Sequence, residues 1–166
     1  IILFKKNLAI KDAGGNVHSY AIGKKYSFKP NEYMFKLDVM IHGKDAAGLN
    51  INGTSYTLRT SPQIRPRFNQ KQNRYENRQF IAYNGKKAKK VILSNNLVKK
   101  YDKDLIWGGI AGKYFMELVI PTDSFILASP TYSARVEKED YANAQAFFER
   151  KGYSGTDISD SYYMYF

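Results

Sequence analysis

The amino-acid sequence predicts a mostly β fold, and three observations support this. The chain has 14 Tyr and 10 Phe among its 166 residues, and aromatic side chains favour the pleated, half-buried surfaces of sheets. Residues 33–41 alternate apolar and polar side chains, which is the period of a half-buried strand. Long Ala- and Leu-rich segments with helical periodicity are absent, and the length suits one domain with its own core.

The first half of the chain is predicted to contain a strand pair followed by irregular segments. Residues 17–28 and 32–42 alternate or nearly alternate, and Lys-Pro-Asn at 29–31 supplies the turn between them. The odd positions of the second strand are apolar, whereas Lys36 and Asp38 point to the opposite face. A polar, glycine-containing loop follows at 43–53, with a candidate hairpin turn at 52–53. Residues 56–59 are predicted to form a short strand, and residues 60–77 a long loop without a core of its own.

A basic hairpin lies at the centre of the sequence. Residues 78–83 and 88–93 are predicted to pair around the Asn-Gly turn at 84–85. The whole net charge of +11 sits in residues 59–103, which hold thirteen Lys or Arg against two acids. Such a patch attracts the phosphates of nucleic acid or of anionic lipid, although a solvated surface that keeps the domain soluble is an equal alternative. The expected membrane or partner contacts are Arg65, Arg67, Arg74, Lys86, Lys87, Lys89 and Lys90.

A second hairpin contains the only tryptophan of the chain. Residues 106–110 form its first strand, residues 111–113 the turn and residues 114–120 the returning strand. Gly108 and Gly109 inside the first strand indicate a β-bulge or a close approach of neighbouring backbone. This segment is therefore expected at the centre of the β fold.

The tryptophan segment is not predicted to cross a membrane. Lys113 and Glu117 interrupt it, and it is short for a bilayer. No run of 18 apolar residues and no signal peptide occur in the sequence. The chain opens without Met and closes on a strand-like segment at 162–166. We therefore expect residues 1–166 to be a single β-domain excised from a longer protein.

One helix is predicted near the C-terminus, at residues 139–150. Acids lie near its start and bases at its end, as the helix dipole favours, and Gly152 stands at the C-cap position. Tyr141, Ala144 and Phe148 share one face that would pack on the sheets. The other segments expected in this part are a short one at 124–129, a polar loop at 154–160 and a last strand at 162–166.

The sequence offers no catalytic, cofactor or metal site. There is no cysteine, so thiolate chemistry and disulfides are excluded. His18 and His42 lack Cys, His or carboxylate neighbours at the spacing of metal ligands. Nucleophile-elbow and phosphate-loop motifs are missing. The acids at 102 and 104 and at 137–140 suit a turn and a helix start better than a glycosidase pair. We expect a protein that is not an enzyme.

Nucleic-acid binding and carbohydrate or peptide binding are two alternative functions. Basic and aromatic residues interleave between 65 and 78, as in single-strand nucleic-acid binders, but no known nucleic-acid motif organises them, so no nucleic-acid partner is expected. A carbohydrate- or peptide-binding module would use a cleft lined by tyrosines. An exposed Trp107 in such a cleft would favour that function, and a buried one would count against it.

Residues 107–115, followed by Ile-Pro at 120–121, resemble the large periplasmic domain of the YidC family of bacterial membrane protein insertases. The positions that match the family pattern are Trp107, Gly109, Tyr114, Phe115 and Pro121. Looser similarity covers the strand pair at 26–41, the segment at 62–80 that precedes the tryptophan strand, and the last strand at 162–166.

This resemblance implies an antiparallel β-sandwich of the β-supersandwich type, related to galactose mutarotase-like domains, with the helix at 139–150 as an insertion. It implies a non-catalytic periplasmic domain of an inner-membrane protein that assists membrane protein insertion and folding. The partners implied are Sec translocon subunits and nascent membrane proteins, and the basic patch could face anionic lipid headgroups. No cofactor is implied, a monomer is favoured, and Trp107, Tyr114 and Phe115 would be core and hairpin residues.

Overall fold

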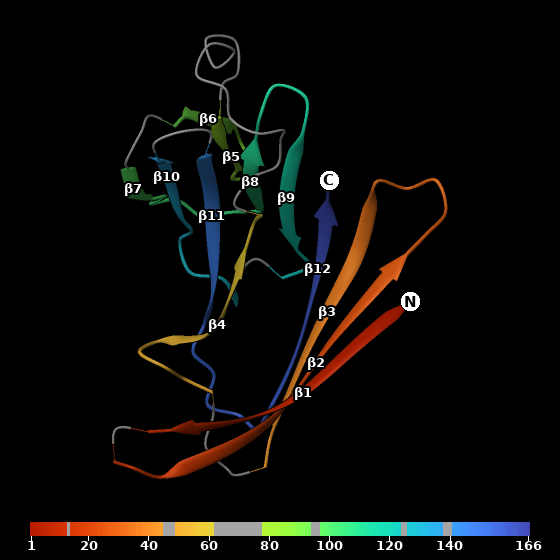
Figure 1. Ribbon diagram of the computed structural model, residues 1–166, viewed down its shortest axis with the longest axis vertical. Helices are drawn as coiled ribbons and strands as arrows, with labels where there is room; N and C mark the ends of the chain where they lie inside the picture. The colour runs from red at the N-terminus through yellow and green to blue at the C-terminus, as the bar shows by residue number, and fades with distance from the viewer. Residues whose placement is uncertain (13, 45–48, 62–77, 94–96, 124–125, 138–140) are drawn as a thin grey trace.

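Twelve strands make up the regular structure of the described residues in the computed structural model, which describes residues 1–12, 14–44, 49–61, 78–93, 97–123, 126–137 and 141–166 (Figure 1). The strands are β1 (Ile2–Lys11), β2 (Val17–Phe28), β3 (Met34–Gly43), β4 (Thr54–Arg59), β5 (Gln79–Tyr83), β6 (Ala88–Ile92), β7 (Leu97–Lys100), β8 (Trp107–Ala111), β9 (Met116–Pro121), β10 (Thr131–Glu137), β11 (Tyr141–Lys151) and β12 (Asp157–Tyr165). Within these residues, no helix is long and apolar enough to cross a membrane.

The strands form two antiparallel sheets. The large sheet has the order β1-β2-β3-β12-β9-β8-β5-β6, and the small sheet has the order β4-β11-β10-β7. The small sheet packs on one end of the large one, where β11 contacts β8 and β5. The strands β1, β2 and β3 extend away from the small sheet (Figure 1). The prediction of a mostly β fold is confirmed. The arrangement is a sandwich in which the outer strands of the large sheet, which we call the free wing, extend beyond the small sheet.

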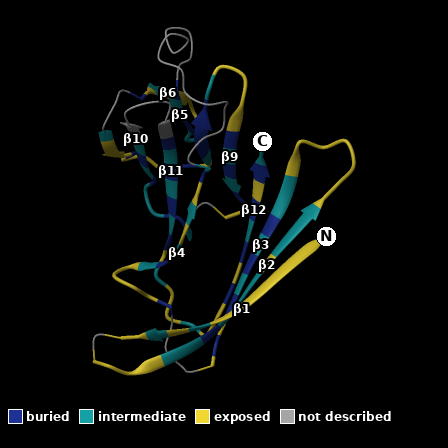
Figure 2. Cartoon of the chain, viewed as in Figure 1, coloured by how far each residue is buried: buried dark blue, intermediate teal, exposed yellow. Residues whose placement is uncertain are grey.

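The core lies between the two sheets and is largely aromatic. Phe80 of β5 stacks on Tyr132 of β10 with ring centroids 4.4 Å apart, and Phe148 of β11 is fully buried. The alternating face predicted for β3 is confirmed, since Leu37 and Ile41 are buried on its inner side. Burial fades toward β1, which is exposed along much of its length (Figure 2).

Most predicted hairpins are present because local turn chemistry specifies them. β2 spans the predicted residues, and Asn31 in the turn to β3 has a φ of 59°. Asn52 and Gly53 also have positive φ and join a bridge between Ile51 and Thr54, as a two-residue hairpin turn requires. β5 and β6 pair around the Asn-Gly turn, and β8 pairs with β9. β1, β7 and β10 are strands that no sequence pattern indicated.

The predicted helix at 139–150 is wrong, because residues Tyr141–Lys151 form β11. β11 pairs with β10 on one side and β4 on the other, so tertiary pairing satisfies its backbone and overrides helix propensity. From residue 144 to 150 burial alternates, with Ala144, Ala146, Phe148 and Arg150 inward. The polar loop expected at 154–160 is also shorter, since β12 begins at residue 157 and turns Ile158 into the core.

Gly109 marks a close backbone approach within the tryptophan hairpin. β8 and β9 pair in continuous register, so no bulge separates them. A Cβ atom on Gly109 would lie 1.9 Å from the carbonyl oxygen of Glu117. A Cβ on Gly112, in the adjoining turn, would have only an ordinary contact of 3.7 Å with the Phe115 carbonyl. Of the two explanations for the glycine pair, the close approach therefore holds.

We expect Gly109→Ala to destabilise the chain by about 2 kcal/mol or more, because the methyl group forces the β8 and β9 backbones apart. Urea unfolding followed by circular dichroism measures this. Gly112→Ala is the matched control and should unfold near the parent midpoint. Equal midpoints for the two variants would contradict the close approach.

Candidate interaction surface

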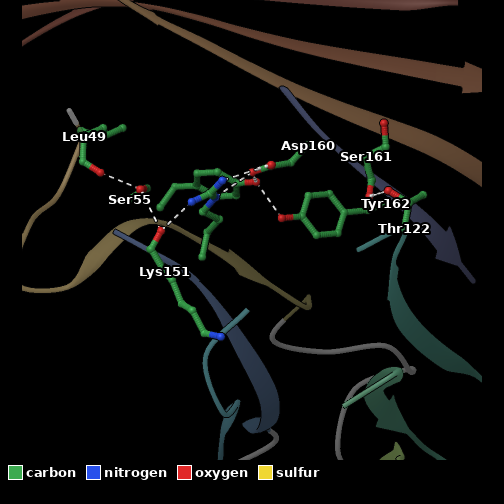
Figure 3. Close-up of polar contacts among 9 residues, drawn as sticks. Leu49, Ser55, Thr122, Lys151, Asp160, Ser161 and Tyr162 are labelled. Carbon is green, nitrogen blue, oxygen red and sulfur yellow. Dashed lines mark hydrogen bonds and ion pairs between the residues drawn. The ribbon is translucent and has the colours of Figure 1, made fainter. Parts of the chain in front are cut away.

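A buried polar cluster joins the two sheets. Arg150 of β11 donates through Nε to Asp160 Oδ2 of β12 at 3.0 Å and through Nη2 to Oδ1 at 3.4 Å. The Tyr56 hydroxyl of β4 donates to the same carboxylate at 2.5 Å and lies 2.6 Å from the Tyr162 hydroxyl. Nη1 of the guanidinium donates to the Lys151 carbonyl at 2.9 Å. Figure 3 shows the Asp160 and Tyr162 side chains within this group of contacts.

The electrostatics of this cluster suit a structural role. Burial raises the Tyr56 pKa far above its ordinary range, and the nearby Asp160 carboxylate raises it further. Burial also raises the pKa of Tyr162 to about 12. Burial by itself lowers the Arg150 pKa, but the hydrogen bonds to Asp160 outweigh it, so the pKa lies above its usual value. The tyrosines therefore stay neutral and the guanidinium charged at any physiological pH.

Glu117 of β9 is a second buried acid between the sheets. Its side chain is 4% exposed, and its Oε2 accepts a hydrogen bond of 2.7 Å from the Ser61 N–H, which follows β4. Burial raises the Glu117 pKa, and the Ser61 N–H only partly opposes this. The carboxylate therefore holds the chain after β4 against the large sheet at some cost in solvation.

The histidines pair with acids distant in the sequence or across a turn. His42 Nδ1 lies 2.6 Å from Asp157 Oδ1, where β3 pairs with β12, and His18 Nε2 lies 3.0 Å from Asp12 Oδ2. The hydrogen bond from His42 lowers the Asp157 pKa. Within the described residues, no three His, Cys, Asp or Glu side chains gather as a metal site would need.

Six exposed lysines lie on two edge strands and on the turn before one of them. β6 is an edge of the large sheet and β7 an edge of the small one, and Lys89 of β6 lies over the ring of Tyr101, which follows β7, at 5.9 Å. We call this surface the lysine edge. Its members are Lys86, Lys87, Lys89, Lys90, Lys99 and Lys100, all exposed. Within the described part of the chain, no carboxylate forms an ion pair with any of them.

The turn geometry orients the lysine edge. Asn84 Oδ1 accepts hydrogen bonds from the backbone N–H groups of Lys86 and Lys87 at 3.2 and 3.1 Å. This closes the turn between β5 and β6 and leaves both side chains in solvent. Lys99 and Lys100 extend the predicted patch onto β7. The expected patch residues Arg65, Arg67 and Arg74 lie outside the described residues.

The residues that match the family pattern lie in different environments. Trp107 is half-buried and stacks on Tyr83 with centroids 5.6 Å apart. Strand alternation places it on the outer face, opposite to Phe80. Tyr114 and Phe115 are exposed in the turn between β8 and β9, and Pro121 is buried. Trp107 is therefore outside the core between the sheets.

A hollow of about 590 Å³ lies over β1 and β2, but it differs from a carbohydrate cleft. It is lined by Phe4, Lys5, Lys6, Leu8, Ile22, Lys24 and Tyr26. Tyr26 is its single tyrosine, and Trp107 lies on another part of the large sheet. Its lining combines aliphatic and basic side chains with the Phe4–Tyr26 pair, and it is not the tyrosine-lined cleft with an exposed tryptophan that a sugar-binding module would need.

We expect Asp160→Asn to destabilise the chain by about 3 kcal/mol or more, because the buried Arg150 guanidinium then lacks a charged partner. Equilibrium urea unfolding measures the change. Asp157→Asn, which breaks the exposed pair with His42, is the control and should change stability little. A similar loss in both variants would show that the buried cluster has no special role.

We expect Glu117→Gln to gain stability relative to the parent as pH rises. Burial raises the Glu117 pKa in the folded protein, so the folded protein binds this proton more tightly than the unfolded chain does. The parent therefore loses stability as pH rises from the ordinary pKa through the raised one. The variant lacks this loss. Urea midpoints of both proteins between about pH 4 and 8 test this, since the unperturbed pKa is about 4.3. A difference that does not change with pH would contradict the assignment.

Comparison with known proteins agrees with the fold and the hairpin. A family model described as the YidC periplasmic domain matches residues 13–153. A protein of Treponema denticola named membrane protein insertase YidC is 30% identical over 166 residues, covering 98% of this chain and 28% of that protein. A protein of the same name from Treponema pallidum is 28% identical over 192 residues, covering 98% of this chain and 30% of that protein.

The chain thus spans less than a third of the length of these relatives. The family model, by contrast, covers most of the chain, from the turn before β2 to the end of β11. The match includes every strand from β2 to β11, with the tryptophan hairpin, and leaves out β1 and β12 of the large sheet. The chain therefore belongs to the YidC periplasmic domain family, a domain located in the periplasm.

Proposed function

We propose that residues 1–166 form one periplasmic domain of an inner-membrane insertase, where it assists insertion and folding of membrane proteins without catalysing a reaction. Membership of the YidC periplasmic domain family supports this proposal. The relatives are named membrane protein insertases and are more than three times as long as the aligned region. The domain would contribute contacts, while other parts of the protein would carry the insertion activity.

The lysine edge is the observation that carries the proposal. Six exposed lysines on β6, on β7 and on the turn before β6 form a cationic surface whose charge no described carboxylate neutralises. Such a surface attracts anionic headgroups or acidic protein segments over about one Debye length, roughly 8 Å at physiological salt. It would hold the domain at anionic lipid, at Sec translocon subunits or at a nascent membrane protein.

Edge protection is the competing explanation for these lysines. Charged side chains on edge strands prevent pairing with other chains, and both β6 and β7 are edges. However, Lys86 and Lys87 belong to the turn and cannot block strand pairing. Lys89 also lies over the ring of Tyr101, which follows β7. Edge protection accounts for lysines on the strands, whereas the two lysines in the turn favour a binding surface.

We expect replacement of Lys86, Lys87, Lys89 and Lys90 by Gln to weaken binding to vesicles rich in phosphatidylglycerol by roughly a hundredfold or more, since each lysine near the surface contributes about 1 kcal/mol. Cosedimentation at several salt concentrations measures this, and the parent should bind less as salt rises. Phosphatidylcholine vesicles should bind both proteins equally weakly.

The control replaces Lys11 and Lys44 by Gln and is compared with the double variant Lys89→Gln and Lys90→Gln, which removes the same charge from the lysine edge. It should retain most of the binding. Equal losses in both variants would show that net charge alone is responsible. Equally weak binding of the parent to neutral and anionic vesicles would reject the lipid contact and leave acidic protein segments as the partner.

A further inference from the structure

The topology brings four chain segments to the same end of the large sheet. The turn between β2 and β3 lies next to the end of β12, where the Phe166 N–H donates to the Tyr33 carbonyl. β12 pairs on its other side with β9, so the turn between β8 and β9 flanks it. The start of β1 pairs with the end of β2, since Ile2 lies opposite Tyr26. Figure 1 shows both turns and both chain ends along the upper and right-hand side of the view.

Exposed aromatic side chains crowd this end, and we call them the aromatic rim. Its members are Phe4, Phe28, Tyr33, Tyr114, Phe115 and Phe166, each between 53% and 79% exposed. Ile1 and Met116 are exposed beside them. Single exposed apolar residues are normal on a protein surface, whereas a gathered set at one end indicates contact with a membrane or a partner.

The rim is anchored in the sheet. Phe35 of β3 stacks on Phe166 at 5.6 Å and contacts Phe28 at 5.1 Å. Tyr26 of β2 links Phe35 to Phe4, with 5.8 Å between centroids on each side. Tyr26 and Phe35 are half-buried against the core. Phe4, Phe28 and Phe166 are therefore the exposed part of a connected aromatic row held in place by the sheet, whereas Tyr33, Tyr114 and Phe115 stand in the two turns.

Basic residues surround the rim. Lys29 stands in the turn beside Tyr33 and pairs with Glu32 at 3.4 Å, and the Lys113 ammonium lies 4.9 Å from the centre of the Tyr114 ring. The other charged residues near the rim are Lys24, Lys25, Lys36 and Asp38. Lysines outnumber acids at this end, so its charge is complementary to an anionic surface.

We propose that the aromatic rim inserts into the interfacial region of a bilayer that contains anionic lipid. Tyr and Phe on projecting turns with Lys beside them match the amphipathic layer between headgroups and hydrocarbon, where aromatic and basic side chains concentrate. A protein partner would favour a flat, packed patch, whereas Tyr33, Tyr114 and Phe115 stand in two separate turns, each more than half exposed. The inference rests on the proposed function in placing the domain beside a membrane.

The absence of native cysteine allows a direct test. Tyr33→Cys and Phe115→Cys, each labelled with an environment-sensitive fluorophore, should show a blue shift with phosphatidylglycerol vesicles and quenching by brominated lipid. Val17→Cys is the matched control, since Val17 is 60% exposed and lies opposite Lys11, at the end of β1 and β2 away from both the rim and the lysine edge. Its label should stay in water. Rim labels that stay in water while the protein is vesicle-bound would overturn the inference.

A binding experiment separates the rim from the lysine edge. At about 1 M salt, where the Debye length is about 3 Å, the residual vesicle binding should fall about tenfold in the triple variant Tyr33→Ser, Tyr114→Ser and Phe115→Ser. Its urea midpoint should match the parent, because these side chains are exposed.

The possible failures are distinguishable. If the lysine-edge variant binds normally and rim labels still insert, the lysine contact fails and the rim stands. If binding is lost with the lysines but rim labels never leave water, the rim inference fails and the proposed function stands. Concentration-dependent self-association of the parent in sedimentation, abolished in the triple variant without any lipid contact, would assign the rim to an interface between copies of the chain.

Discussion

The ion pair between Arg150 and Asp160 connects strands that follow each other in the chain but belong to different sheets. β11 lies at the centre of the small sheet and β12 at the centre of the large one. An ion pair buried this deeply loses its solvation and is tolerated only with good geometry and satisfied hydrogen bonds. Tyr56 and the Lys151 carbonyl complete those bonds. The position of one sheet on the other therefore depends on this cluster and on the aromatic core beside it.

This placement explains why one part of the large sheet is left uncovered. The small sheet has four strands, and β11 contacts β5 and β8, far from β1 in the strand order. β1 is consequently exposed along most of its length, whereas β3 still buries Leu37 and Ile41, and the tips of these strands remain exposed (Figure 2). A rigid sandwich with a free wing presents two different surfaces, one cationic at the edge strands and one aromatic at the strand tips. The two surfaces therefore differ in chemistry and in their place on the large sheet.

Sequence patterns predicted the elements whose structure is set by neighbours along the chain. The strand β3 follows from strict alternation, and the turns at Asn31 and Gly85 follow from residues that accept positive φ. The β11 segment is wrongly predicted as a helix because its acids lie near the start and its bases near the end, as a helix dipole favours. Its inward residues nevertheless lie at every second position, as in a strand. The basic turn before β6 is predicted by the sequence. The contact between Lys89 of β6 and the ring of Tyr101, which follows β7, is not, since it joins strands of different sheets.

The amino-acid sequence by itself determined the mostly β class, the hairpins and the confinement of charge to one segment. These follow from periodicity, turn chemistry and composition, which act over a few residues. Only the tertiary structure decided that His42 meets Asp157, that Arg150 meets Asp160 across the sheets, and that six aromatic rings share one exposed end. Strands with the same alternation are interchangeable locally, so their order is decided by which pairing buries the most apolar surface while satisfying every buried charge.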